Sequence, residues 1–289
     1  MINFRHQLVH KVMLEDRFIF KKEGMYMSFD KNELRELKIS GSGSSSGGKF
    51  DEVSISGSGK IYGDTECNNF RISGSGKVIG NLNASEFKIS GSGGVEGNLK
   101  CKSGKISGSG KVLGHVDSED FNISGSGKIE GDLSGKEITI SGSAKVLGSI
   151  YGTDVKISGG IDIEKNVETD NFQMTGSFKS KGMLNAENVN IYLGGISNVE
   201  EIGATNIEIL KRPSRNNIVA LIAKVIGNNF GTLTTKVIEA DEIYLENTKA
   251  EVVRGKNVII GDGCNIKLVE YKNELKILGN GIVGEERHI

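Results

Sequence analysis

Few side chains of this 289-residue chain are spaced to do catalytic or metal chemistry. The four histidines are His6, His10, His115 and His288, and only His115 falls within the repeated part of the sequence. We see no cluster of metal ligands and no base paired with a nucleophile. The sequence therefore predicts no catalytic residue, no metal and no cofactor, and we expect a protein that is not an enzyme.

Carboxylates are abundant, and several of them recur at one position of a repeat. Glu86, Asp120, Glu137 and Asp154 follow one another at a step of 17 or of twice 17. A glycosidase would instead need two carboxylates on opposite sides of one sugar. The column therefore predicts solvated positions along one face rather than a catalytic pair.

Lysines form the most regular charged pattern, and two interpretations of it are open. One repeat position carries Lys60, Lys77, Lys111, Lys128 and Lys145, and another carries Arg71, Lys88, Lys105 and Lys156. The first interpretation is a solvated face that keeps neighbouring molecules apart. The second is a basic stripe that binds an anionic polymer or a lipid surface. The net charge of −1 argues against nucleic-acid binding over the whole chain.

All of these side chains are placed by a short sequence repeat whose step is 17 residues. Ile-Ser-Gly-Ser-Gly begins at Ile39, Ile55, Ile72, Ile89, Ile106 and Ile123, and its first position continues at Ile140, Ile157, Met174 and Ile191. Only the first step differs, at 16. Further apolar residues recur six and ten positions after the Ile and two before it, with the period of two that is typical of strands.

Between these apolar residues stand glycines that suit tight corners. The chain contains 41 Gly, one Pro and no Trp, which favours thin rungs over a thick globular core. The predicted fold is all-β: a single-stranded parallel β-helix, or β-solenoid, with triangular rungs of about 17 residues stacked about 4.8 Å apart.

The cysteines Cys67, Cys101 and Cys264 are predicted to be buried, reduced thiols. Cys67 and Cys101 share one inward position two rungs apart, about 10 Å, which is beyond the reach of a disulfide. No secretory signal is visible at the N-terminus, and no apolar run reaches the length of a membrane-spanning helix. We therefore expect a cytoplasmic protein.

The first residues, 1–26, do not fit the repeat, and two interpretations of them are open. Lys22-Glu23-Gly24 can be encoded by a bacterial ribosome-binding sequence ahead of Met27, so residues 1–26 would not be translated. Alternatively, they form a flexible or helical N-terminal arm. The intact mass of the native protein decides between the two.

Later departures from the repeat divide the rest of the chain. We predict a regular array over 27–210, an interruption over 211–230, further rungs over 231–280 and a polar tail over 281–289. In the further rungs, Ile243, Ile260 and Ile277 again follow one another at a step of 17.

The interruption holds the one proline, Pro213, and then an apolar segment over 218–226. Ile218, Leu221, Ile222 and Val225 would share one face of a short helix, and a buried strand is the alternative. The segment is either packed under or inside the solenoid, or exposed for self-association or membrane contact.

Three stretches of the array resemble the repeating core of the bactofilins, the polymer-forming bacterial cytoskeletal proteins. They are Ser-Gly-Lys-Ile-Glu-Gly-Asp-Leu at 126–133, Gly-Lys-Val-Ile-Gly-Asn-Leu at 76–82 and Gly-Lys-Val-Leu-Gly-His-Val at 110–116. The resemblance covers roughly residues 34–209. It implies a right-handed triangular β-helix that assembles end to end into filaments without nucleotide and scaffolds envelope or appendage machinery. The implied partners are other copies of the chain and, at the inner face of the membrane, the membrane surface or envelope-associated proteins.

We therefore expect a non-enzymatic scaffold protein that self-assembles through its terminal rungs, because the last rung of a stack leaves strand edges unpaired. One alternative is a surface adhesin, which would require export. The other is a β-helical carbohydrate-active enzyme or acyltransferase, which would show longer coils or a six-residue step with a catalytic histidine.

Overall fold

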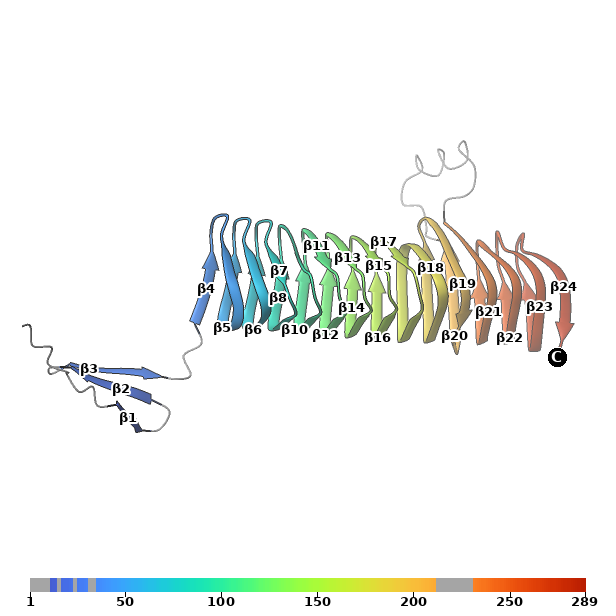
Figure 1. Cartoon of the computed structure of the whole chain (residues 1–289). Coiled ribbons are helices and arrows are strands. Elements are labelled where there is room, and N and C mark those ends of the chain that lie inside the picture. Colours follow the sequence, from blue (N-terminus) through green and yellow to red (C-terminus); the bar gives the residue numbers. More distant parts are fainter. Residues whose placement is uncertain (1–10, 15–16, 23–24, 31–34, 212–230) are drawn as a thin grey trace, which may run out of the picture.

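The computed structural model describes residues 11–14, 17–22, 25–30, 35–211 and 231–289. Every regular element in these ranges is a β-strand. Three strands form an antiparallel sheet, and the other 21 form a parallel solenoid of about 14 turns (Figure 1). The prediction of a parallel β-solenoid with about 17 residues per turn is confirmed.

The antiparallel sheet consists of β1 (Lys11–Leu14), β2 (Arg17–Lys22) and β3 (Met25–Asp30). The first solenoid strands are β4 (Arg35–Ile39), β5 (Ser44–Ile55), β6 (Lys60–Ile72), β7 (Lys77–Ile79), β8 (Leu82–Ile89), β9 (Ser92–Val95) and β10 (Leu99–Ile106). The middle strands are β11 (Ser109–Val112), β12 (Val116–Ile123), β13 (Ser126–Ile129), β14 (Leu133–Ile140), β15 (Ser143–Val146), β16 (Ile150–Ile157) and β17 (Gly160–Ile163). The last strands are β18 (Val167–Leu193), β19 (Ile196–Gly203), β20 (Asn206–Lys211), β21 (Thr232–Leu245), β22 (Thr248–Ile260), β23 (Asn265–Ile277) and β24 (Ile282–His288).

The strands β9 and β10 show how the sequence builds one rung. The buried residues of β10 are Leu99, Cys101, Gly104 and Ile106, and two consecutive exposed residues, 102 and 103, separate them into two pairs. Each pair has the spacing of a strand with one buried face, and the two exposed residues mark the bend between the pairs. Together with β9, each rung has the three straight segments that the apolar spacing predicts.

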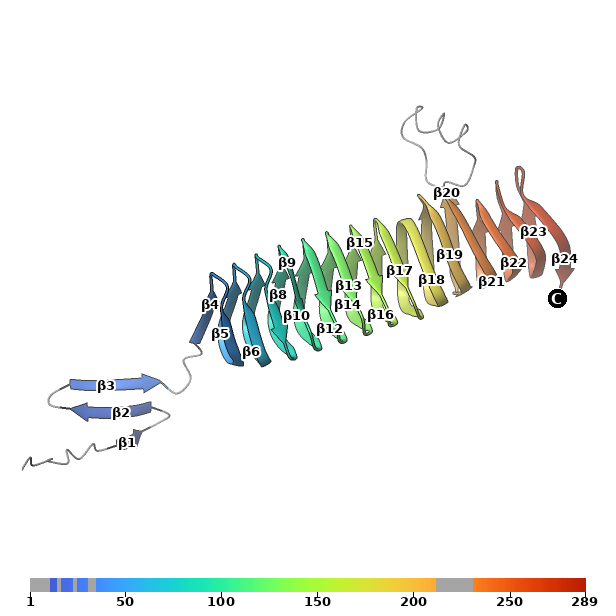
Figure 2. The ribbon, with the colours of Figure 1, turned by 45° about the horizontal axis from the view of Figure 1, so that its top comes forward.

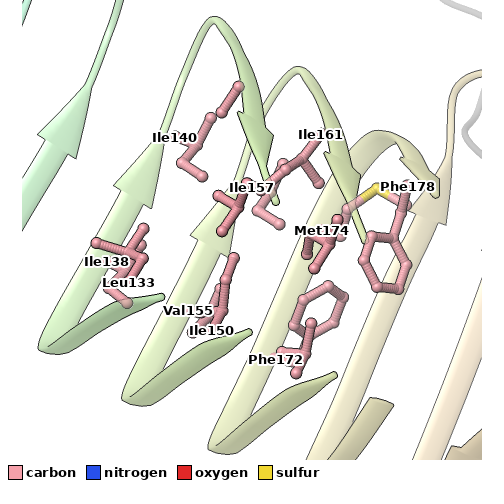
Figure 3. Packing of buried hydrophobic residues seen from close by; sticks show 14 of the residues in the cluster. Leu133, Ile138, Ile140, Ile150, Val155, Ile157, Ile161, Phe172, Met174 and Phe178 are labelled. Carbon is pink, nitrogen blue, oxygen red and sulfur yellow. The ribbon is translucent and has the colours of Figure 1, made fainter. Parts of the chain in front are cut away.

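Strand pairing stacks equivalent residues of successive rungs directly on one another. Ile89 pairs with Ile106 at a step of 17, and both side chains are fully buried. Figure 3 shows the same column further along the solenoid, where Ile157 and Met174 lie side by side in the interior. The core is therefore a set of continuous apolar columns, in which each buried isoleucine contributes about 1.5–3 kcal/mol.

The first glycine of an Ile-Ser-Gly-Ser corner is required by the preceding rung wherever such a rung lies beside it. A Cβ atom added at Gly108 would lie against the carbonyl oxygen of Gly91, far inside contact distance. The same oxygen accepts a hydrogen bond from the amide of Ser109 at 2.9 Å. Rungs stacked at hydrogen-bonding distance thus leave no room for a side chain at this position.

A second corner is joined by side chains that stand nine positions after the Ile. His115 donates its amide hydrogen to Asn98 Oδ1 at 2.9 Å, and its Nδ1 accepts the amide hydrogen of Asp132 at 3.0 Å. Asp64, Asn81 and Asp132 accept in the same way from the next rung. This corner ladder satisfies backbone amides that regular strand pairing leaves free.

Replacing His115 by asparagine should preserve the corner ladder, because asparagine carries the acceptor in neighbouring rungs. The change His115→Ala should lower the free energy of unfolding by about 1 kcal/mol, since the amide of Asp132 loses its acceptor. Urea unfolding of both variants measures the difference. An equal loss in both would show that the imidazole ring matters for another reason.

The interruption of the repeat falls within one rung of the solenoid. Ile196 in β19 pairs with Thr232 in β21 at a step of 36, and the excess over 17 equals the length of the segment 212–230. The pairing of β20 with β21 has the same step. One parallel solenoid therefore continues across the interruption, while the predicted apolar segment 218–226, with its candidate helix, lies outside the described residues.

The register of the C-terminal rungs differs from the expected one. Ile243 pairs with Val258, so it does not share a column with Ile260, and the prediction of a constant step of 17 is wrong there. Ile260 pairs with Leu245 at a step of 15 and with Ile277 at a step of 17. The shorter step arises because only residues 246 and 247 join β21 to β22.

The antiparallel sheet spans the boundary that was predicted at residue 27. Met27 lies inside β3 and pairs with Phe20 in β2. A chain begun at Met27 would therefore keep most of β3 without the two strands that precede it. Whether residues 1–26 are translated stays a prediction for intact-mass measurement.

Candidate assembly site

The predicted lysine stripe is one column of the solenoid. Lys60 pairs with Lys77, and Lys128 pairs with both Lys111 and Lys145, while Gly94 interrupts the column between them. The sequence therefore placed these five residues together correctly.

Glutamates neutralise most of this stripe. Lys77 contacts Glu96 at 3.0 Å, and Glu130 contacts both Lys111 at 3.1 Å and Lys128 at 2.9 Å. Hydrogen bonds from Lys128 and Lys111 hold the pKa of Glu130 below its ordinary value. The stripe is thus a mixed-charge surface, and its binding to an anionic polymer or lipid stays a prediction.

A shallow groove of about 740 Å³ runs along another part of the solenoid. Its floor is formed by small residues at one position of successive rungs, namely Cys67, Ala84, Cys101, Ser118, Gly135 and Gly152. Ion pairs between adjacent rungs line it, with Lys49–Glu66 at 2.9 Å and Lys100–Asp117 at 3.0 Å. The groove therefore offers a charged and hydroxylated wall.

The thiols in this groove are poor nucleophiles. Cys67 and Cys101 are free and buried, two rungs apart in one column as predicted. Burial raises the pKa of Cys67 to about 12 and the pKa of Cys101 to about 11. Burial also raises the pKa of Cys264 to about 11. Because the thiolate is the reactive form, these groups are kept inert at neutral pH.

We expect all three thiols to resist a water-soluble disulfide reagent at pH 8 in the folded protein and to react rapidly once it is denatured. Colorimetric thiol counting before and after addition of guanidinium measures this. Stoichiometric labelling of native protein at that pH would contradict the burial and the raised pKa values.

The C-terminal end of the solenoid presents an open edge. The last strand, β24, pairs with only the first part of β23, over residues 265–271. The rest of β23 has no strand beyond it in the described part of the chain. Apolar residues are exposed at this end: Ile277 by 42%, Leu278 by 45%, Ile282 by 60% and Ile289 by 55%. Figure 2 shows β24 as the outermost strand at this end.

The core column that ends at this edge is fully buried in the preceding rung. Ile260, which pairs with Ile277 from the rung before, is fully buried, because a rung covers it on each side. Ile277 occupies the same column, but in the described part of the chain a rung covers it on one side only. The core column thus ends at solvent, where a further strand could continue it.

An ion-pair cluster fastens the last strand to the body of the solenoid. Arg287 in β24 contacts Glu270 at 2.8 Å, and Arg254 contacts the other carboxylate oxygen at 2.8 Å. Glu270 is only 8% exposed, and the hydrogen bond from Arg254 lowers its pKa. Arg254 also contacts Glu239 in the preceding rung at 2.9 Å. These ion pairs therefore hold the edge strand β24 to the two preceding strands β23 and β22.

The opposite end begins with β4, which pairs in parallel with β5. Gly41 there has open space where a side chain would project, whereas glycines of the same corner in later rungs are covered. Ile39 has the largest exposed fraction, 9%, of the buried apolar residues. Both features indicate that the stack is less covered at this rung.

Within the described ranges, no three His, Cys, Asp or Glu side chains are grouped to hold a metal ion. None of the described elements is a helix long and apolar enough to cross a membrane. The candidate contact residues Ile218, Leu221, Ile222 and Val225 lie outside the described part of the chain, so their role stays a prediction.

Comparison with known proteins finds two partial relatives. The chain is 43% identical over 91 residues to the uncharacterized protein YhbF of Bacillus subtilis (strain 168). This match covers 31% of the present chain and 34% of YhbF. The chain is 39% identical over 93 residues to the uncharacterized protein YhbE of the same organism, covering 32% and 37%. The matches thus span about a third of each relative. No protein-family model and no solved structure matches the chain. The protein is therefore a β-solenoid partly homologous to two bacterial proteins.

Proposed function

We propose that the chain is a non-enzymatic, bactofilin-like scaffold protein that assembles with other copies of itself through its terminal rungs. The observation that carries this proposal is the C-terminal edge, which no strand of the described residues covers: Ile277 is exposed at the unpaired end of β23, and Ile282 is exposed on the outermost strand β24. An exposed apolar strand edge is a template for pairing with another chain. Inside the solenoid, the column of Ile277 is closed by the next rung, as it is at Ile260. Ile282 instead continues an outward column through Asn265 and Lys249.

Stacking between molecules would repeat the contact that already holds rungs together. The pairing of β22 with β23 joins two rungs through backbone hydrogen bonds and apolar columns. A second molecule placed on the edge of β23 and β24 would extend both. It would also bury side chains that a solitary solenoid leaves in water, each contributing up to about 1.5–3 kcal/mol.

The chemistry of the described surfaces supports a structural role. Two of the charged pairs that line the groove, Lys49–Glu66 and Lys100–Asp117, bind one another, and burial raises the pKa of its thiols well above neutral pH. Following the resemblance, we propose that the assemblies lie in the cytoplasm at the inner face of the membrane. Envelope-associated proteins would be the partners there.

Sedimentation velocity of the purified full-length protein over a wide concentration range tests the proposal. We expect species larger than one chain, growing with concentration and lost when Ile277 and Ile282 are both replaced by aspartate. A chain that stays monomeric at high concentration would overturn the proposal. Turnover of a polysaccharide would equally do so.

A further inference from the structure

Two columns of opposite charge run side by side along one flank of the solenoid, which we call the two-column face. The acidic column contains Glu52, Glu86, Asp120, Glu137 and Asp154, and the basic column contains Arg71, Lys88, Lys105 and Lys156. Within a rung the two positions are two residues apart on one strand, as Glu86 and Lys88 are. Side chains two apart on a strand point to the same side, so the columns are neighbours.

The charges in the middle of the two-column face form no ion pairs. Among the described residues, none of the members named above for either column makes one, and Asp154 accepts only a hydrogen bond from Asn171 at 3.2 Å. The two positions are paired within the chain only in the terminal rungs, at Glu36–Lys38 and Glu274–Lys276, whereas the lysine stripe is neutralised by contacts such as Lys77–Glu96. Glu86 and Lys88 are both exposed. This flank therefore keeps charges of both signs available to a partner.

We infer that the two-column face is where two copies of this chain pack side by side, with their solenoid axes parallel and pointing in the same direction. A two-fold axis parallel to the solenoid exchanges the two columns. The acidic column of each copy then faces the basic column of the other. Glu86 faces Lys88 of the second copy, and Asp154 faces Lys156 of the second copy.

The sequence of the columns fits this arrangement along its whole length. From Glu52 and Ser54 to Glu274 and Lys276, no rung carries two charges of the same sign at these two positions. Parallel copies in register therefore oppose no like charges. Antiparallel copies would instead lay the acidic column on the acidic column, and like charges directly opposite one another are unfavourable.

The charges set direction and register, and apolar contacts on the same flank would add affinity. An exposed ion pair contributes at most about 1 kcal/mol. In the C-terminal rungs, Tyr244 and Ile259 continue the basic column, and both are partly exposed. Tyr192, next to this face, is 39% exposed. The first rungs of the flank thus carry the charges that set the register, and the last rungs carry exposed apolar residues.

This inference goes beyond end-to-end assembly, because it uses the flank of the solenoid and not its ends. Residues 86 and 88 lie several rungs from either terminal rung, so end-to-end stacking does not bring them near their counterparts. Lateral pairing can therefore hold or fail independently of the proposed function.

Crosslinking of cysteine variants tests the arrangement. Full-length Glu86→Cys protein is mixed with full-length Lys88→Cys protein and treated with a short bismaleimide. We expect strong crosslinking between these two, and little between Glu86→Cys and Lys156→Cys. The wild-type chain is the control, since its own thiols are buried. Preferential linking of residue 86 to residue 156, or no linking in either mixture, would overturn the inference.

Charge exchange provides a second readout. Lys88→Glu should weaken lateral association roughly fivefold at low salt, because it places two carboxylates opposite each other at two symmetric sites. The double variant Glu86→Lys, Lys88→Glu should restore association, since the copies again oppose unlike charges. Association that is unchanged in the single variant, as measured by sedimentation with Ile277 and Ile282 both replaced by aspartate to block the ends, would contradict the inference.

Discussion

Replacing Gly108 by alanine should lower the free energy of unfolding by roughly 2–4 kcal/mol. The added Cβ would meet the carbonyl oxygen of Gly91, which belongs to the backbone and cannot move aside as a side chain could. That carbonyl also accepts the hydrogen bond from Ser109 that joins the two rungs. The clash therefore strains the stacking itself. Thermal unfolding followed by circular dichroism measures the effect.

Gly41 provides a matched control for this prediction. It occupies the same corner of the same Ile-Ser-Gly-Ser-Gly string, but nothing lies within 4 Å of the position of its Cβ. The change Gly41→Ala should leave the unfolding midpoint unchanged or slightly raised, because alanine reduces the freedom of the unfolded chain. Equal destabilisation at both sites would show that the corner requires glycine for its backbone conformation and not for the neighbouring rung.

The double change Ile277→Asp and Ile282→Asp should weaken end-to-end association at least a hundredfold. Burying Ile277 in a continued core column contributes about 1.5–3 kcal/mol, and a carboxylate at the same place must instead be desolvated. Ile282 points outward from the edge strand β24, where a stacked molecule would cover it only in part. Ile282 is 60% exposed, and Ile277, at 42%, lies in the terminal rung, so the preceding rungs should keep their fold. Light scattering against concentration measures the association, and circular dichroism verifies the fold.

The matched control for this variant is Tyr62→Asp. Tyr62 is 51% exposed, similar to Ile277 and Ile282, but it lies on a flank of the solenoid. The Tyr62→Asp change removes a comparably exposed aromatic group without altering the terminal edge. Association lost equally in both variants would mean that general surface hydrophobicity, and not the open edge, holds the assembly together.

The features of the fold that depend on one rung and its immediate neighbour could be predicted from the sequence. The column of Ile89 and Ile106, the corner glycines and the alignment of the lysine stripe all follow from the constant step of the repeat. The same step placed Cys67 and Cys101 two rungs apart. Each of these features recurs in almost every rung, so its spacing is visible without coordinates.

Features with another period or a shorter corner could not be predicted in this way. Glu96, Glu130 and Glu164 recur only in every second rung, so the 17-residue repeat does not predict the glutamates that neutralise the lysine stripe. The step of 15 between Leu245 and Ile260 depends on the corner at 246–247, whose geometry no apolar spacing reveals. That the last rung leaves strand edges unpaired could be predicted from the stacking, but which side chains are exposed there, such as Ile277, depends on how far β24 covers β23.

Electron microscopy of the purified full-length protein tests the central claim most directly. The account predicts unbranched filaments built from solenoids joined at their ends, which disappear in the Ile277→Asp, Ile282→Asp variant and persist in Tyr62→Asp. Fields that show only isolated rods, each the length of one solenoid, at high protein concentration would contradict it.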